Sequence, residues 1–157
     1  MTEAVTLQDY VVPELIFLNE SFTSQNEFFE KIYDKAFSLG YVREDFLERI
    51  KAREATFPTG LQLEDMGVAI PHTDAECVLK EFVAVVTTSP VGFKSMEDIN
   101  QDVSVEIAFV LGLNEPHSQL EMLQSLMGLL QNKEILSELK QAKTSEEVIQ
   151  LVKTNHL

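Results

Sequence analysis

Apolar residues spaced three or four positions apart predict helices toward both ends of the chain. The expected helices span residues 25–39, 43–54, 118–131, 133–140 and 145–153. Thr23 or Ser24 can cap the first helix with a side-chain oxygen, and Gly40 can end it. Polar and turn-forming residues separate these segments, so each is expected to be a separate helix.

Short apolar runs between the helices predict a sheet. The expected strands span residues 15–18, 68–70, 81–88 and 103–113. In the last of these, apolar residues occupy every second position from Val103 to Leu111, which is the pattern of a strand. Because helices precede and follow the strands, we expect one α/β domain over residues 1–157, with its core at about 15–152. Its mixed sheet would be covered by helices on both faces.

The composition is that of an ordinary globular protein. Hydrophobic residues make up 45% of the 157 positions, and no apolar run is long enough to cross a bilayer. The N-terminus lacks the basic and then apolar order of a signal peptide. Cys77 is the only cysteine, which excludes an intrachain disulfide. A reducing, cytoplasmic location is therefore expected.

The formal net charge is −14, from 26 acidic and 12 basic residues. Such a chain repels nucleic acid and anionic lipid, so neither is expected as a partner, and no membrane insertion is expected. The charge could steer a basic protein partner toward the surface, or it could serve solubility alone.

His72 stands out among the three histidines. It follows the apolar run from Val68 to Ile70, which is typical of a buried strand. Pro71 has no N–H for a sheet ladder, so the strand is expected to end there. His72 then lies at the carboxyl end of a strand, where open α/β sheets bind ligands. Its imidazole is suited to accepting and passing on a charged group near neutral pH.

Arg53, Thr59 and Gly60 could together bind an anion near His72. Arg53 presents a planar fork of donors that fits phosphate, although it could equally be a solvated cation at a helix end. Thr59 and Gly60 lie in a turn whose hydroxyl and backbone N–H groups could surround phosphate oxygens. The alternative for these two residues is turn chemistry alone.

His117 follows the long strand and precedes a helix, whose N-terminus offers donors to an anion. The alternative is an exposed loop histidine. Cys77 is interpreted as a packed thiol. His72, Asp74 and Glu76 have a spacing that matches no standard zinc or calcium site, so no metal ligands are expected. The chain also lacks the glycine-rich nucleotide motifs, and no cofactor is expected.

These residues together describe a histidine that carries phosphate. The imidazole would attack the phosphorus of an activated donor, while Arg53, Thr59 and backbone N–H groups hold the phosphoryl oxygens. The chemistry would depend on positioning and charge stabilisation, with no need of a metal or a nucleotide.

Two stretches resemble the IIA domains of the bacterial sugar phosphotransferase system, of the mannitol/fructose type. They are Arg53 to Leu61 and Gly67 to Thr73, and the Phe-Pro-Thr-Gly form at 57–60 is similar to the galactitol branch. A later stretch, 114–123, resembles the second-histidine region of the family. The likeness covers about residues 15–152.

The resemblance implies a free-standing phosphotransferase subunit. His72 would accept a phosphoryl group from phospho-HPr and pass it to a cysteine of a IIB subunit, which serves a membrane IIC. Arg53 would steady the phosphate, and His117 would be an unphosphorylated second active-site histidine. Thr73 and Ser118 depart from the residues that usually follow the two histidines in the family.

Two other functions remain open at this point. A related regulatory IIA would bind a target protein, and phosphorylation of His72 would switch that binding. A metal-dependent hydrolase would use His72, Asp74 and His117. The sugar cannot be named from the sequence, because a IIA subunit contacts only phosphate and protein partners.

Overall fold

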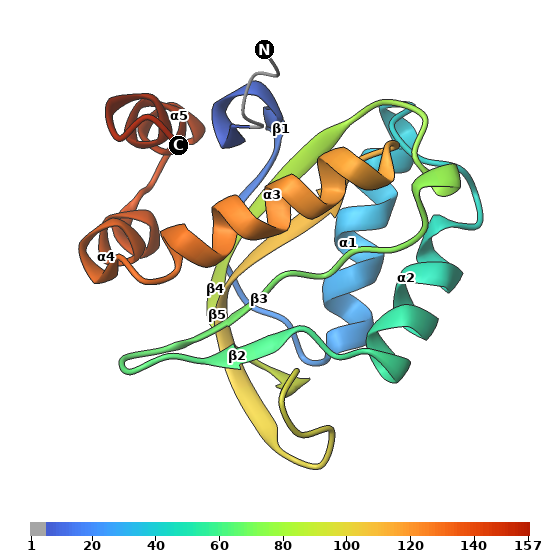
Figure 1. Ribbon diagram of the computed structural model, residues 1–157, viewed down its shortest axis with the longest axis horizontal. Coiled ribbons are helices and arrows are strands. Elements are labelled where there is room, and N and C mark those ends of the chain that lie inside the picture. The colour runs from blue at the N-terminus through green and yellow to red at the C-terminus, as the bar shows by residue number, and fades with distance from the viewer. Residues whose placement is uncertain (1–5) are drawn as a thin grey trace.

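A mixed sheet of five strands runs through the middle of the computed structural model, which describes residues 6–157 (Figure 1). The strands are β1 (Val11–Glu20), β2 (Gly60–Gln62), β3 (Gly67–Ala69), β4 (Phe82–Lys94) and β5 (Asp102–Gly112). In space they follow the order β1-β4-β5-β3-β2. β1 is parallel to β4 and β3 to β5, whereas the β4–β5 and β2–β3 pairs are antiparallel. The expected mixed sheet is confirmed.

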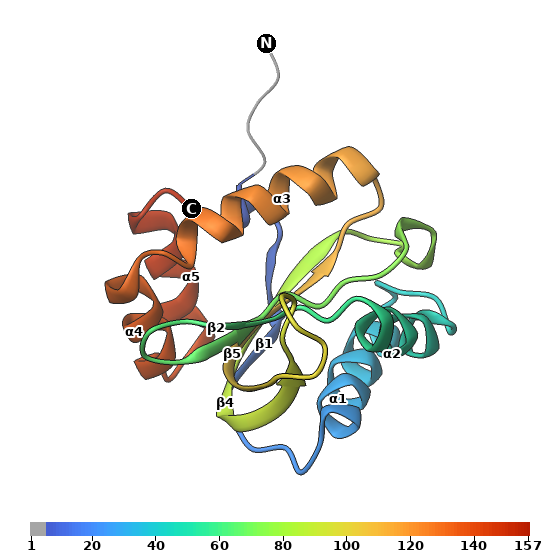
Figure 2. The ribbon, with the colours of Figure 1, turned by 60° about the horizontal axis from the view of Figure 1, so that its bottom comes forward.

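Helices cover both faces of this sheet, as Figure 2 shows from a second direction. On one face lie α1 (Gln25–Ser38) and α2 (Phe46–Thr56), and on the other α3 (Pro116–Leu129), α4 (Lys133–Gln141) and α5 (Ser145–Thr154). Two short 3-10 helices, η1 (Leu7–Asp9) and η2 (Ala75–Cys77), were not expected from the sequence. None of the helices in residues 6–157 is both long enough and apolar enough to cross a bilayer.

Local signals explain where α1 begins and ends. The Ser24 hydroxyl accepts a hydrogen bond from the Glu27 N–H at 3.2 Å, which confirms Ser24 as the cap. Gly40 follows the helix with a φ of 81°, a left-handed conformation that glycine adopts without a steric penalty.

The prediction for α2 was wrong at its start, because the helix begins at Phe46 rather than at residue 43. The Arg43 N–H donates to the Cys77 carbonyl at 2.9 Å, so the chain here pairs with the segment after His72. Two strands are also longer than predicted. β4 continues past Pro90 to Lys94, with an irregular register between Thr87 and Val91 where proline offers no N–H. β1 likewise extends on both sides of residues 15–18.

The alternating residues of β5 do not share one face. Val103 and Val105 pack in the core between the sheet and the α1–α2 pair, whereas Ile107, Phe109 and Leu111 pack in the core under α3, α4 and α5. The change falls opposite the irregular stretch of β4, where Val91 pairs with Val105 and Thr87 with Ile107. The pairing with β3 is irregular at the same point, since Gly67 pairs with Val105 and Val68 with Ile107, which leaves one extra residue in β5. A bulge of one residue reverses the facing of the strand beyond it.

Candidate active site

His72 lies where the parallel strands β3 and β5 approach their carboxyl ends. Beyond β3 the chain keeps its pairing with β5, since the Leu111 N–H donates to the Pro71 carbonyl at 2.9 Å and His72 forms an isolated bridge with Leu111. The imidazole is half-buried at this edge of the sheet. The backbone therefore confirms that His72 lies at a strand end, as predicted.

The ring of His72 is held in one tautomer. Its Nδ1 lies 2.9 Å from the Ile70 carbonyl oxygen. A carbonyl oxygen only accepts hydrogen bonds, so Nδ1 must carry the proton. In the neutral ring, Nε2 then has its lone pair free for a bond to an electrophile.

Burial lowers the pKa of His72, and the nearby Arg53 guanidinium lowers it further. The hydrogen bond to Ile70 favours the charged ring and opposes this shift, but it is the smaller effect. The ring is thus kept neutral near pH 7, which is the form that can act as a nucleophile.

Arg53 lies in the last turn of α2 with its side chain exposed. Its guanidinium carbon is 4.9 Å from the centre of the Phe57 ring, which restricts the fork of donors to one side. With Thr73 and Asp74 it lines a depression of about 280 Å³. Among residues 6–157, no carboxylate lies within ion-pair distance of Arg53. Its donors are available to an incoming anion.

Thr59 is buried, and both of its donors are already used. Its N–H donates to Glu54 Oε2 at 2.6 Å and its hydroxyl to Glu54 Oε1 at 2.8 Å. The same hydroxyl oxygen accepts the Ile70 N–H at 3.2 Å. Phosphate binding by Thr59 stays a prediction, and it would require these donors to leave Glu54.

Gly60 is required by packing. A Cβ atom at this position would lie 2.5 Å from the Lys94 carbonyl oxygen, closer than atoms can approach. The Gly60 carbonyl accepts the Met96 N–H at 2.8 Å, which joins β2 to the end of β4. Phosphate binding by Gly60 likewise stays a prediction.

His117 reaches the same end of the sheet from α3, close after the end of β5. Its side chain is 77% exposed, and its Nε2 lies 2.7 Å from Glu121 Oε1 on the next turn of the helix. The ring of His117 thus pairs with Glu121. The role of a second active-site histidine stays a prediction for His117.

Sequence comparison decides the family. Residues 9–155 match the family described as "Phosphoenolpyruvate-dependent sugar phosphotransferase system, EIIA 2". The chain belongs to this EIIA family. It is therefore a phosphotransferase component of the sugar phosphotransferase system, and the resemblance inferred from Arg53 to Leu61 and Gly67 to Thr73 is confirmed.

This EIIA protein is similar to three known proteins. The galactitol-specific EIIA component of Escherichia coli K12 is 33% identical over 120 residues, which are 76% of this chain and 79% of that protein. The nitrogen regulatory protein IIA-Ntr of Neisseria meningitidis superposes with a TM-score of 0.76 at 27% identity, covering 92% of this chain and 97% of that one. The mannitol IIA of Escherichia coli, solved in complex with phosphorylated IIB, gives a TM-score of 0.73 at 23% identity, with 92% and 97% covered.

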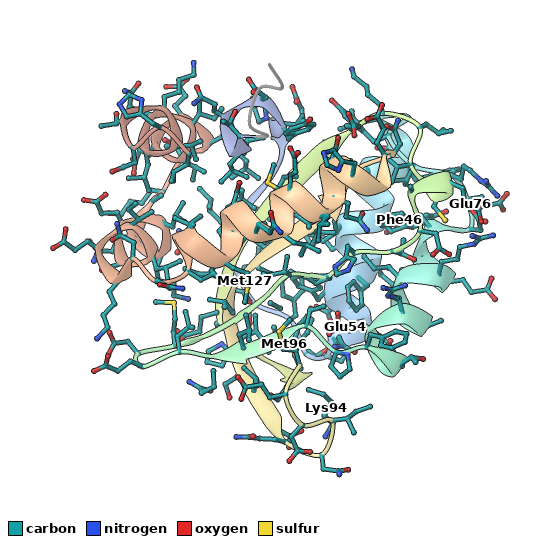
Figure 3. All side chains as sticks on the ribbon, in the orientation of Figure 1. Phe46, Glu54, Glu76, Lys94, Met96 and Met127 are labelled. Atoms are coloured by element: carbon teal, nitrogen blue, oxygen red, sulfur yellow. The ribbon has the colours of Figure 1, made fainter. Side chains whose placement is uncertain are left out.

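Sequence reasoning missed Glu54 as a feature of this EIIA site. Its side chain points from α2 into the fold and is only 4% exposed, whereas Glu76 lies at the outer rim of the molecule (Figure 3). Burial raises the pKa of Glu54 to about 7, although the two hydrogen bonds from Thr59 favour the charged form. In the sequence, an acid beside Arg53 resembles an ordinary surface residue, so only its contact with Thr59 could have identified it.

Arg49 is a second residue that was missed. It lies one turn before Arg53 on α2, and its Nη1 is 3.1 Å from Asp74 Oδ2 and also pairs with Glu76. Its Nε lies 3.1 Å from Asp45 Oδ2. These contacts hold the loop that follows His72 against α2.

Asp74 and Glu76 are therefore ion-pair partners of Arg49. Within the described part of the chain, no three metal-ligating side chains come together. The structure gives no support to a metal-dependent hydrolase that uses His72, Asp74 and His117. Cys77 is buried, and burial raises the pKa of its thiol, which confirms a packed cysteine.

Proposed function

We propose that this EIIA protein is a cytoplasmic phosphocarrier that takes a phosphoryl group from phospho-HPr on His72 and passes it to a cysteine of a IIB subunit. The observation that carries the proposal is the hydrogen bond between His72 Nδ1 and the Ile70 carbonyl. It leaves Nε2 of a neutral ring as the nucleophile, at the edge of the sheet beside the exposed Arg53.

The transfer needs only two nucleophilic steps. The lone pair of Nε2 forms the new N–P bond, while the P–N bond of the donor breaks and its electron pair stays on the donor. A IIB thiolate then attacks the phosphorus, and Nε2 recovers its electron pair. Arg53 would bind the equatorial oxygens throughout, because its fork of donors matches their geometry.

A IIB acceptor is supported by the mannitol IIA, which was solved in complex with phosphorylated IIB. Galactitol or a related polyol is the substrate class that we favour for the transport system. The 33% identity to a galactitol-specific EIIA component supports it, as does the Phe-Pro-Thr-Gly turn at 57–60.

A regulatory role is the second candidate, favoured by the likeness to the nitrogen regulatory protein IIA-Ntr. In that role the phosphate on His72 would switch the binding of a target protein. The two candidates differ in whether phosphate leaves His72 for a IIB cysteine.

The test is to rebuild the relay. Incubation with labelled phosphoenolpyruvate, enzyme I and HPr should place acid-labile phosphate on the wild-type protein and on His117→Ala, but not on His72→Ala. Addition of a galactitol-type IIB should then remove the label. Label that persists in His72→Ala would overturn the site, and label that stays on His72 in the presence of IIB would favour the regulatory role.

A further inference from the structure

The backbone pairing of β2 with β3 ends at Gly60 and Ala69. At the next pair of residues, hydrogen bonds that involve side chains take the place of backbone hydrogen bonds. Gly60 pairs with Ala69, so Thr59 and Ile70 come next in the antiparallel register. The Thr59 N–H turns to Glu54 instead, and the Ile70 N–H is accepted by the Thr59 hydroxyl. The strand end that delivers His72 is therefore held by a side-chain bridge.

Ile70 is bound on both sides. Its N–H is fixed by Thr59 at 3.2 Å, and its carbonyl accepts the His72 Nδ1–H at 2.9 Å. Pro71 lies between Ile70 and His72 and restricts the backbone further, since its ring fixes φ. A continuous series of contacts thus runs from the Glu54 carboxyl through Thr59 and Ile70 to the imidazole.

The hydrogen-bonded pair of Glu54 and Thr59 is energetically unfavourable to bury. Glu54 and Thr59 are 4% and 3% exposed, and burial of a carboxyl is unfavourable unless its hydrogen bonds are satisfied. The raised pKa of Glu54 reflects that cost. An apolar pair of the same volume would fill the space without it, so packing alone does not explain the two polar residues.

We propose that Glu54 and Thr59 are positioning residues for His72. They fix the Ile70 backbone, and the Ile70 carbonyl in turn fixes the Nδ1–H tautomer and directs Nε2 outward. The inference rests on the proposed function for its effect on transfer, but the tautomer itself can be measured with no phosphoryl donor present.

Thr59→Val tests the proposal, since valine keeps the shape and removes the hydroxyl. In ¹⁵N spectra of the imidazole, we expect His72 to change from one tautomer to a mixture. We also expect the rate of phosphoryl transfer from phospho-HPr to fall about tenfold. Thr59→Ser, which restores the hydroxyl, should recover both. Glu54→Gln should act in the same direction, because one of the two oxygens that accept from Thr59 becomes an NH2 group, which only donates. This variant serves if Thr59→Val does not fold.

Thr87→Val is the matched control. Thr87 is a buried threonine in β4 whose hydroxyl oxygen accepts a backbone N–H, from Asn19 at 2.9 Å. It pairs with Ile107 of β5, whereas His72 bridges to Leu111, four residues further along that strand. Its loss should lower stability and leave the His72 tautomer and the transfer rate unchanged. A folded Thr59→Val or Glu54→Gln protein with the wild-type tautomer would overturn the proposal. A wild-type protein that has the single tautomer but takes no phosphate would instead contradict the proposed function.

Discussion

The two histidines at this end of the sheet are held in different ways. His72 is half-buried, and its ring is bound to the Ile70 carbonyl within a network that includes Thr59 and Glu54. His117 is 77% exposed, and its ring contacts Glu121 on its own helix. A nucleophile must be kept in one protonation state and one orientation, whereas a group that only supports a bound phosphate can move. The buried network is therefore the reason that we propose His72, rather than His117, as the histidine that reacts.

The largest expected effect is on stability, and it comes from Glu54 in the buried network around His72. Because its pKa is raised from 4.5 to about 7, the folded protein keeps a proton that the unfolded chain releases between these values. Relative to Glu54→Gln, the free energy of unfolding of the wild-type protein should fall by about 3 kcal/mol as pH rises from about 4.5 to 8. The lowered pKa of His72 gives the opposite slope, but its main cause is burial, which both proteins share, so this contribution largely cancels. Urea unfolding across this range measures the difference, and parallel curves would show that the pKa of Glu54 is not raised in the folded protein.

Arg53 is exposed but lies near the half-buried His72. We expect its replacement to slow phosphoryl transfer and to leave folding unchanged. Arg53→Lys keeps the charge but loses the fork of donors. We expect about 2 kcal/mol less transition-state stabilisation, or roughly a thirtyfold slower transfer from phospho-HPr. Arg43→Lys is the same substitution at a residue that pairs with Asp45, and it should transfer at nearly the wild-type rate. Equal rates for both variants in single-turnover assays would make Arg53 a surface cation only.

The smallest effect on phosphoryl transfer is expected at the exposed His117. His117→Gln should leave the label on His72 and slow transfer about fivefold, since one hydrogen bond to the phosphate is worth about 1 kcal/mol. His156→Gln changes another exposed histidine and should have no effect. If His117→Gln abolished labelling as completely as His72→Ala, the distinction between the two histidines would be wrong.

The sequence predicts those features of the fold that depend on local patterns. The apolar run ending in Pro71 places His72 at a strand end, and the polar residues before α1 include its cap, Ser24. The reversal of facing within β5 could not be predicted, because it depends on an extra residue in the pairing of β5 with β3, a strand far from it in the sequence.

In the candidate site, too, features that depend on local sequence could be predicted and those that depend on tertiary contacts could not. Arg53 and His72 are recognisable by residue type and position. The bridge from Glu54 to Ile70 joins the end of α2 to two strands, and the pair of Arg49 with Asp74 joins residues far apart in the chain. In each case the partner is set by tertiary packing, so a carboxylate that looks like a surface acid in the sequence is buried or paired in the fold.

If the fold prepares Nε2 of His72 for phosphorylation, the phosphate must be found on that atom. Long-range ¹H–¹⁵N spectra of the phosphorylated protein, with ³¹P detection of the N–P bond, test it most directly. We predict phosphate on Nε2 of His72, with Nδ1 still protonated and bound to the Ile70 carbonyl. Phosphate on Nδ1, or on either ring nitrogen of His117, would contradict this account.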